Sequence, residues 1–257
     1  MPSIKQDSFG NLADGREAKV YTLRNVDGNE LKVTDYGARI VSMRFRNNNF
    51  ENKFLLKSYP DISGYEKDTT TNIIYVDDDV NGFDKTFWNV EKVIEGLKLT
   101  AEVDGKSVEI IYSISNDDEI SIKYKATGVN DVSAQLVFSA EVLPSPDISV
   151  YNEEKTKGKI EGKNTYNIID EPAIVEMEVG MFGYDPGCPI DWIDAGLKNA
   201  ADIVSEEAAI SMNIYATQNK IQVEALEGGF AIKTNDTKKY DEGVIKGQTV
   251  YFLKNKD

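Results

Sequence analysis

The sequence predicts an all-β protein with mostly antiparallel strands, and three observations support this prediction. Apolar and polar residues alternate over many short runs, which is typical of strands with one buried face. Turn-forming pairs such as Asp104-Gly105 separate these runs at short intervals. Runs with the helical period of 3.6 residues are scarce. Many short strands joined by frequent turns indicate a β-sandwich.

The first half of the chain contains a hairpin, one helical turn and a meander. Residues Glu17–Asn25 and Glu30–Thr34 form the expected hairpin, because the sequence VDGN between them favours a turn. Pro60–Tyr65 is expected to hold one short turn of helix. Residues 97–103, 108–114 and 120–126 each alternate, and tight turns separate them. These three runs predict an antiparallel meander.

The second half contains further alternating runs and one ambiguous segment. The stretch Ile190–Asp202 does not favour either helix or strand. The expected strands are Gln135–Leu143, Ala209–Tyr215, Ile221–Ala225, Phe230–Thr234 and Gln248–Leu253. No linker rich in Pro, Gly or Ser divides the 257 residues, and no internal repeat is visible. The sequence therefore predicts one domain over residues 1–257.

The charge of the chain restricts its partners. It contains 44 acidic and 29 basic residues, which gives a formal net charge of −15. Such a protein repels phosphate backbones and anionic lipid surfaces, so we expect neither nucleic acid nor a membrane as a partner. The single cysteine, Cys188, excludes an internal disulfide. No leader pattern and no run of about 20 apolar residues is visible, so we expect a cytoplasmic protein.

The chain has no histidine. Histidine is the side chain that usually titrates near neutral pH, so its absence excludes Ser–His and Cys–His nucleophile systems and His-ligated zinc. Acid–base chemistry would have to use carboxylates, Lys, Tyr or Cys. The acidic run Asp77–Asp79, with Asp84 nearby, has the residue type that binds calcium but lacks EF-hand spacing. We interpret it as a solvated loop and predict no metal and no cofactor.

Three segments carry motifs of one known family. Residues Asp14–Asn25 lead into Val33–Ser42, which contains the sequence TDYGA. Residues Gly82–Trp88 have the sequence GFDKTFW, and the meander follows from Gly96 to Ala126. Taken in this order, the segments resemble the aldose 1-epimerase (galactose mutarotase) family in patches over nearly the whole chain. The resemblance implies a twisted β-sandwich of the supersandwich type that binds a sugar in a cleft on one sheet.

The resemblance also implies which positions carry the chemistry. Mutarotation needs a base for the proton of the anomeric hydroxyl and an acid for the ring oxygen. The family uses a histidine as the acid and a glutamate as the base, and these positions correspond to Ser139 and Lys233. A serine hydroxyl is a poor proton donor, and the reference pKa of lysine is about 10.4. A Ser139–Lys233 pair that transfers protons in a new way is an alternative only if burial lowers the lysine pKa.

Three further residues are implied to bind the sugar or are candidates for it. The family's second histidine corresponds to Asp77, and Phe182–Asp185 matches a segment in which Asp185 accepts a sugar hydroxyl. Trp192, in a turn-rich stretch, is a candidate for stacking on a sugar ring. We expect Trp88, by contrast, to pack in the core. Motif strands that are missing between residues 65 and 75 imply an open or remodelled cleft.

Two functions follow from these residues and from the resemblance. The first is an aldose 1-epimerase-like protein that binds a carbohydrate or a protein partner and has lost most or all mutarotase activity. The alternative is an active aldose 1-epimerase in which Asp77, Asp185 or Lys233 replaces the usual catalytic groups. A purely structural or interaction domain is a third class, which would bind no sugar.

Overall fold

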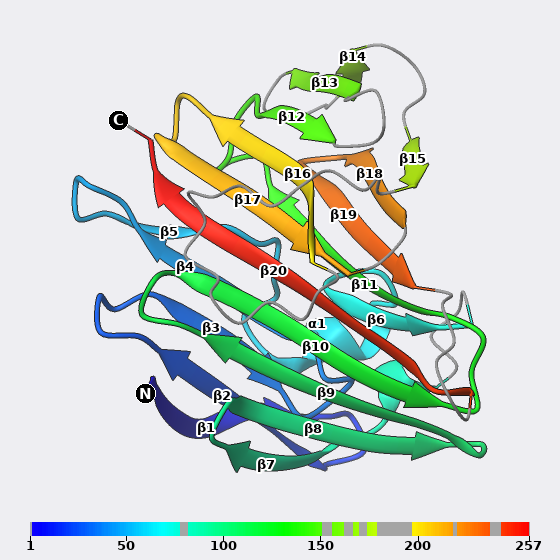
Figure 1. The fold of residues 1–257 in the computed structure, drawn as a ribbon. Coiled ribbons are helices and arrows are strands. Elements are labelled where there is room, and N and C mark those ends of the chain that lie inside the picture. The colour runs from blue at the N-terminus through cyan, green and yellow to red at the C-terminus, as the bar shows by residue number, and fades with distance from the viewer. Residues whose placement is uncertain are drawn as a thin grey trace.

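The computed structural model describes residues 2–77, 82–150, 156–161, 167–169, 174–178, 197–217, 220–236 and 243–256. These residues form three sheets, and the paired strands within each sheet are antiparallel (Figure 1). The prediction of an all-β, mostly antiparallel sandwich is therefore confirmed. Among the described residues, no helix has the length and hydropathy needed to cross a membrane.

The strands of each sheet are as follows. The first sheet has the order β1 (Ser3–Asn11), β2 (Glu17–Arg24), β3 (Glu30–Thr34), β4 (Ile40–Arg46), β5 (Asn52–Phe54). The large sheet has the order β14 (Asn167–Ile169), β13 (Thr156–Glu161), β12 (Asp147–Val150), β16 (Lys198–Ser205), β17 (Ile210–Ala216), β20 (Ile245–Asn255), β10 (Glu119–Thr127), β9 (Lys106–Ile114), β8 (Gly96–Val103), β7 (Asn89–Val93). The third sheet has the order β15 (Ile174–Glu178), β18 (Lys220–Leu226), β19 (Gly229–Asp236), β11 (Val132–Ser139), β6 (Ile73–Val76). One short helix, α1 (Ile62–Lys67), and one 3₁₀ turn, η1 (Phe83–Lys85), complete the fold.

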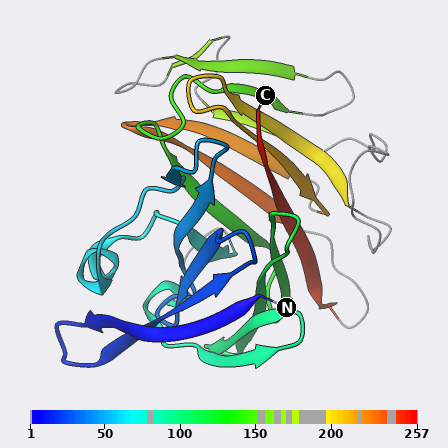
Figure 2. The same cartoon turned by 90° about the vertical axis from the view of Figure 1, so that its left-hand side faces the viewer.

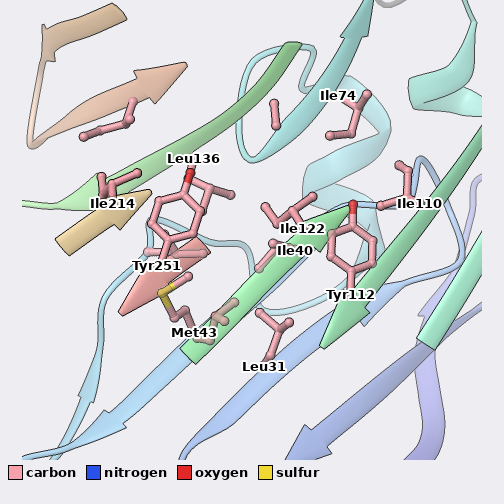
Figure 3. Close-up of a cluster of buried hydrophobic side chains, with 14 of the residues drawn as sticks. Leu31, Ile40, Met43, Ile74, Ile110, Tyr112, Ile122, Leu136, Ile214 and Tyr251 are labelled. Atoms are coloured by element: carbon pink, nitrogen blue, oxygen red, sulfur yellow. The ribbon is translucent and has the colours of Figure 1, made fainter. Parts of the chain in front are cut away.

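One hydrophobic core lies between the large sheet and the two smaller sheets (Figure 2). Figure 3 shows that all three sheets contribute side chains to it, for example Leu31 from β3, Leu136 from β11 and Ile122 from β10. The Tyr112 hydroxyl of β9 donates a hydrogen bond of 2.6 Å to the carbonyl of Ala38, which ties the large sheet to the β3–β4 turn. The central strands of each sheet therefore turn one face toward this core.

Most predicted elements are present at nearly the predicted bounds. The meander corresponds to β8, β9 and β10, the hairpin to β2 and β3, and the helical turn to α1. Strand β11 ends at Ser139, earlier than predicted, because the Ser139 carbonyl accepts the N–H groups of Val142 and Leu143 in a turn. Residues 198–202 of the ambiguous stretch belong to β16. Strand β1 was not predicted, because most of its residues are exposed and show no alternation.

The TDYGA turn and the GFDK segment interlock. The Gly37 N–H donates to the Thr86 carbonyl at 2.9 Å, and the Trp88 N–H donates to the Asp35 carbonyl at 2.8 Å. Gly37 has a φ of +72°, and a Cβ atom added there would lie 2.6 Å from the Asp84 carbonyl oxygen. Only glycine fits this conformation and this approach without strain. Trp88 is 3% exposed, so its predicted place in the core is confirmed.

Asn72 joins two segments along the edge of β11. Strand β6 pairs with the first half of β11, and residues 55–57 bond to its second half through the Lys57 N–H and the Leu55 carbonyl. Asn72 lies between them with a φ of +51°. Its side-chain amide donates to the Lys57 carbonyl at 2.9 Å and accepts the Val137 N–H at 2.8 Å. The edge of the third sheet is thereby continuous in hydrogen bonding.

Candidate functional site

The third sheet presents polar side chains on the face that points away from the core. Alternate residues of its strands, such as Ile74, Leu136, Phe230, Ile232 and Val223, pack in the core. Successive side chains of a strand point to opposite faces, so the residues between them point outward. We call the following set the polar face: Tyr75 of β6, Gln135 of β11, Lys233 of β19, and Gln222 and Glu224 of β18. All five are half-buried.

Strand register arranges three members of the polar face in one row. Gln135 is directly opposite Lys233, and Lys233 is directly opposite Gln222. Directly opposite side chains of an antiparallel pair have Cβ atoms about 4.5–5.5 Å apart, so the three can touch one ligand. The Lys233 ammonium nitrogen lies 4.7 Å from the centre of the Tyr75 ring, in cation–π geometry. Tyr75 therefore adjoins this row.

Gln135 and Tyr75 are held in place by hydrogen bonds. The Gln135 side-chain amide donates to the Thr70 carbonyl at 2.7 Å, and the Gln135 side chain also bonds to the Tyr75 hydroxyl. Burial raises the pKa of Tyr75, and the carboxylates of Asp68 and Glu224 reinforce this shift, although nearby cationic and amide groups oppose it. Tyr75 is therefore a neutral phenol at physiological pH, able to donate and accept hydrogen bonds.

A buried ionic cluster fixes the loop that holds Gln135. The Arg39 side chain is fully buried, and it donates to the carbonyls of Asp68 at 2.6 Å and Thr71 at 3.0 Å. Its guanidinium lies 3.6 Å from the Asp68 carboxylate and 3.7 Å from that of Asp84. Lys85 supplies a second cation, 3.4 Å from Asp84. The two cations and two carboxylates offset each other, and they hold the loop that accepts the Gln135 amide.

Ser139 and Lys233 are not opposite each other. Ser139 pairs with Gly229, four positions along β19 from Lys233, which corresponds to about 13 Å. The structure therefore does not bring together the two side chains of the alternative proton-transfer pair. The residue that it places opposite Lys233 is Gln135. The roles of Ser139 and Lys233 in the family's chemistry stay predictions.

Asp77 has structural partners at the end of β6. Its carboxylate lies 2.7 Å from the Lys106 ammonium and accepts the N–H groups of Asn130 at 2.5 Å and Asp131 at 3.4 Å. Partial burial opposes them, but these donors lower the pKa of Asp77 below its usual value. These bonds join β6 to the loop before β11 and to the β8–β9 hairpin. Its role in sugar binding stays a prediction.

The other predicted ligand residues lie outside the described residues. These are Asp185 and Trp192, and the same holds for Cys188. Within the part of the chain that the structure describes, no group of three or more Asp, Glu or Cys side chains is arranged to hold a metal ion.

Sequence reasoning missed Gln135, Tyr75, Gln222 and Glu224 as members of the site. A usable signal was present for Gln135, because it is the one long polar side chain between the apolar residues of β11. Its alternation with Ala134 and Leu136 places it on the outward face. The register that sets it opposite Lys233 depends on pairing between residues about 100 positions apart, and no local pattern encodes that pairing.

Comparisons with known proteins give a fold but no sequence family. No protein-family model matches the chain, and no curated protein matches it. Two solved structures align over 100% of this chain and 100% of their own: a GalM/aldose epimerase homologue from C. elegans, with 10% identity and a TM-score of 0.65, and a galactose 1-epimerase from Lactobacillus acidophilus, with 9% identity and a TM-score of 0.64. A putative mutarotase (YeaD) from Salmonella typhimurium aligns over 93% of this chain and 91% of its own, with 7% identity and a TM-score of 0.57. The chain therefore has the galactose mutarotase-like fold that its sequence motifs implied.

Proposed function

We propose that this chain is an aldose 1-epimerase-like protein that binds a carbohydrate on the polar face and has lost most or all mutarotase activity. The observation that carries the proposal is the cross-strand pair Gln135–Lys233. An amide and an amine stand opposite each other on the two strands to which the family resemblance assigns the acid and the base. Hydrogen-bonding side chains beside a tyrosine ring suit sugar hydroxyls and the apolar face of a sugar ring.

The loss of activity follows from the chemistry of these groups. An amide does not titrate, and neither does a serine hydroxyl near neutral pH, so neither Gln135 nor Ser139 can replace an imidazole acid. The absence of histidine holds for the entire sequence. General acid and general base catalysis each contribute about 10²–10⁴-fold in rate, so losing both removes most of the acceleration.

Polarimetry tests the loss of activity. Purified protein is added to freshly dissolved α-D-glucose or α-D-galactose, and the approach to anomeric equilibrium is followed. We expect the sugar to mutarotate at the same rate as in buffer without protein. A clear acceleration would favour the alternative, an active epimerase with substituted groups. The variants Asp185→Ala and Lys233→Ala then decide whether those residues act, because activity that survives both changes excludes them.

Calorimetric titration with neutral hexoses tests binding. Gln135→Ala and Tyr75→Phe each remove hydrogen bonds worth about 0.5–1.5 kcal/mol, so each variant should bind about two- to tenfold more weakly. Lys98→Gln on β8, in the large sheet, is the matched control and should bind like the parent. Binding that is absent in the parent chain, or unchanged in all variants, would contradict a carbohydrate site here.

A restored acid–base pair tests the register. The double variant Gln135→His with Lys233→Glu places an imidazole opposite a carboxylate, and we expect it to accelerate mutarotation measurably while each single variant does not. The comparison is Ser139→His with Lys233→Glu, whose groups are four positions apart. A faster reaction in that second double variant would show that the acid position is Ser139, as the resemblance implies, and not the residue opposite Lys233.

A further inference from the structure

Two hairpin tips of the first sheet are joined into one surface. The β2–β3 loop (25–29) and the β4–β5 loop (47–51) project at the same end of the molecule (Figure 1, left). The Arg46 N–H donates to the Asn29 side chain at 2.7 Å, and Arg44 donates to the Gly28 carbonyl at 2.5 Å. We call this surface the joined tips and define it by Val26, Arg46, Phe50, Glu51 and Phe54.

The joined tips expose large apolar side chains. Val26 is 76% exposed, Phe50 is 75% exposed and Phe54 is 52% exposed. Single exposed apolar residues are common on protein surfaces and need no explanation. Here, however, three of the five exposed large apolar residues of the described chain belong to two bonded loops and the adjacent strand. Their clustering indicates a contact surface.

Phe50 is also held in an unfavourable backbone conformation. Its φ is +60°, in the left-handed region where glycine and asparagine are favoured and a bulky side chain is an outlier. Its ring is not buried by the fold, and the Arg46 guanidinium lies 5.0 Å from the ring centre. A residue that costs stability both by strain and by exposure is a reasonable candidate for a function outside the fold.

The charge distribution indicates which partner fits. Residues 1–56 contain nine basic and seven acidic residues, and the remaining 201 contain 20 basic and 37 acidic residues. The part of the chain that forms the first sheet is thus close to neutral, and the remainder carries the acidic excess. Among the described residues, Arg46 has no carboxylate partner, and the Glu51 side chain is 57% exposed beside Lys53. The joined tips therefore carry both signs of charge around an apolar centre.

We propose that the joined tips bind the joined tips of a second copy of this chain in a two-fold contact. Residues 1–56 carry little net charge, so two copies repel each other less through the joined tips than through a surface with the acidic excess, although Asp118 of the β9–β10 turn bonds to Asn25 and Asn29 at their edge. A two-fold contact is self-complementary, so Arg46 of each copy can approach Glu51 of the other while the apolar side chains meet. Aromatic residues and arginine are also the residue types enriched at the centres of interfaces.

The size of the surface limits the strength of the dimer. A stable interface buries about 800 Å² on each partner, and three apolar side chains supply only part of that. We therefore expect a weak, reversible dimer with a dissociation constant of about 10 μM to 1 mM. The dimer does not involve the polar face, so it is independent of the proposed function.

Sedimentation velocity over about 5 μM to 1 mM chain tests the proposal, and a concentration-dependent shift from monomer to dimer is expected. Phe50→Asn removes the ring and suits positive φ, so it should weaken the dimer at least tenfold without loss of folding. Arg46→Glu should weaken it as well. The matched control is Ile94→Asp, since Ile94 is 84% exposed on the β7–β8 turn, outside the joined tips.

Three results would overturn the proposal. These are a monomer at every concentration, a dimer that Phe50→Asn leaves intact, and a dimer that Ile94→Asp weakens equally. Sugar binding measured on Phe50→Asn should equal that of the parent chain, which separates this proposal from the proposed function.

Discussion

Asp35 provides a quantitative test of the electrostatics of the TDYGA turn. Asp35 is 8% exposed, and its carboxylate accepts the Lys19 N–H at 2.9 Å. Burial raises the pKa of Asp35 from 3.8 to about 6, against the lowering effect of the Lys19 N–H. A raised folded-state pKa means that this group contributes stability below about pH 4 and loses it as pH rises through 6. A shift of about two pKa units corresponds to about 3 kcal/mol.

Asp35→Asn removes the charge and keeps an oxygen that can accept the Lys19 N–H. The variant should match the parent in unfolding free energy near pH 4 and exceed it by about 2–3 kcal/mol at pH 8. Urea unfolding of both proteins from pH 4 to 8 measures this difference, which should rise mainly between pH 4 and 6 and level off above pH 6. Asp14→Asn is the control, because Asp14 is exposed and Arg16 lowers its pKa. A difference that is constant with pH, or a variant that is weaker at pH 8, would refute the reasoning.

Three further predictions concern the loops around the third sheet. Burial opposes ionisation of Asp68, but hydrogen bonds to Thr71, Thr70 and Tyr59 lower the pKa of Asp68 to about 2. The unfolding free energy of Asp68→Asn should therefore be about 2 kcal/mol lower than that of the parent above pH 4 and should equal it below pH 2, as measured by acid unfolding. Asn72→Ala leaves two backbone groups without side-chain partners and should cost about 2–4 kcal/mol in urea unfolding, whereas an equal stability would show that the bridge is dispensable. Gly37→Ala should cost about 3 kcal/mol or more because of its positive φ and the nearby Asp84 carbonyl, and a thermal midpoint equal to that of the parent would contradict the interlock.

The sequence was sufficient for the architecture because local patterns encode it. Alternation in the runs that became β8, β9 and β10 gives both the strand and its buried face, and Asp104-Gly105 gives the turn. Strand β1 has no alternation because it lies at a sheet edge with little burial. The short strand β5 is also without a signal, since three residues cannot establish a period.

The candidate site was predicted only in part, because it depends on pairing between distant strands. Lys233 was singled out from its position in a motif, and the structure places it on the outward face of β19. Its opposite residue is set by the register of β11 against β19, and a shift of four positions separates Gln135 from Ser139. The Arg39 cluster depends on three loops that meet only in the folded chain. No local pattern contains that information.

The interlocked turns have a consequence for how this fold can change its chemistry. The backbone bonds among Asp35, Gly37, Thr86 and Trp88 satisfy one another without any side chain of the polar face. The motif segments therefore join parts of the fold to one another, and they support the polar face only through the Arg39 cluster, which holds the loop that accepts the Gln135 amide. A sequence can keep these backbone hydrogen bonds while the side chains of the polar face change from groups that transfer protons to groups that only bind a ligand. A match to these motifs therefore indicates the fold and not the catalytic activity.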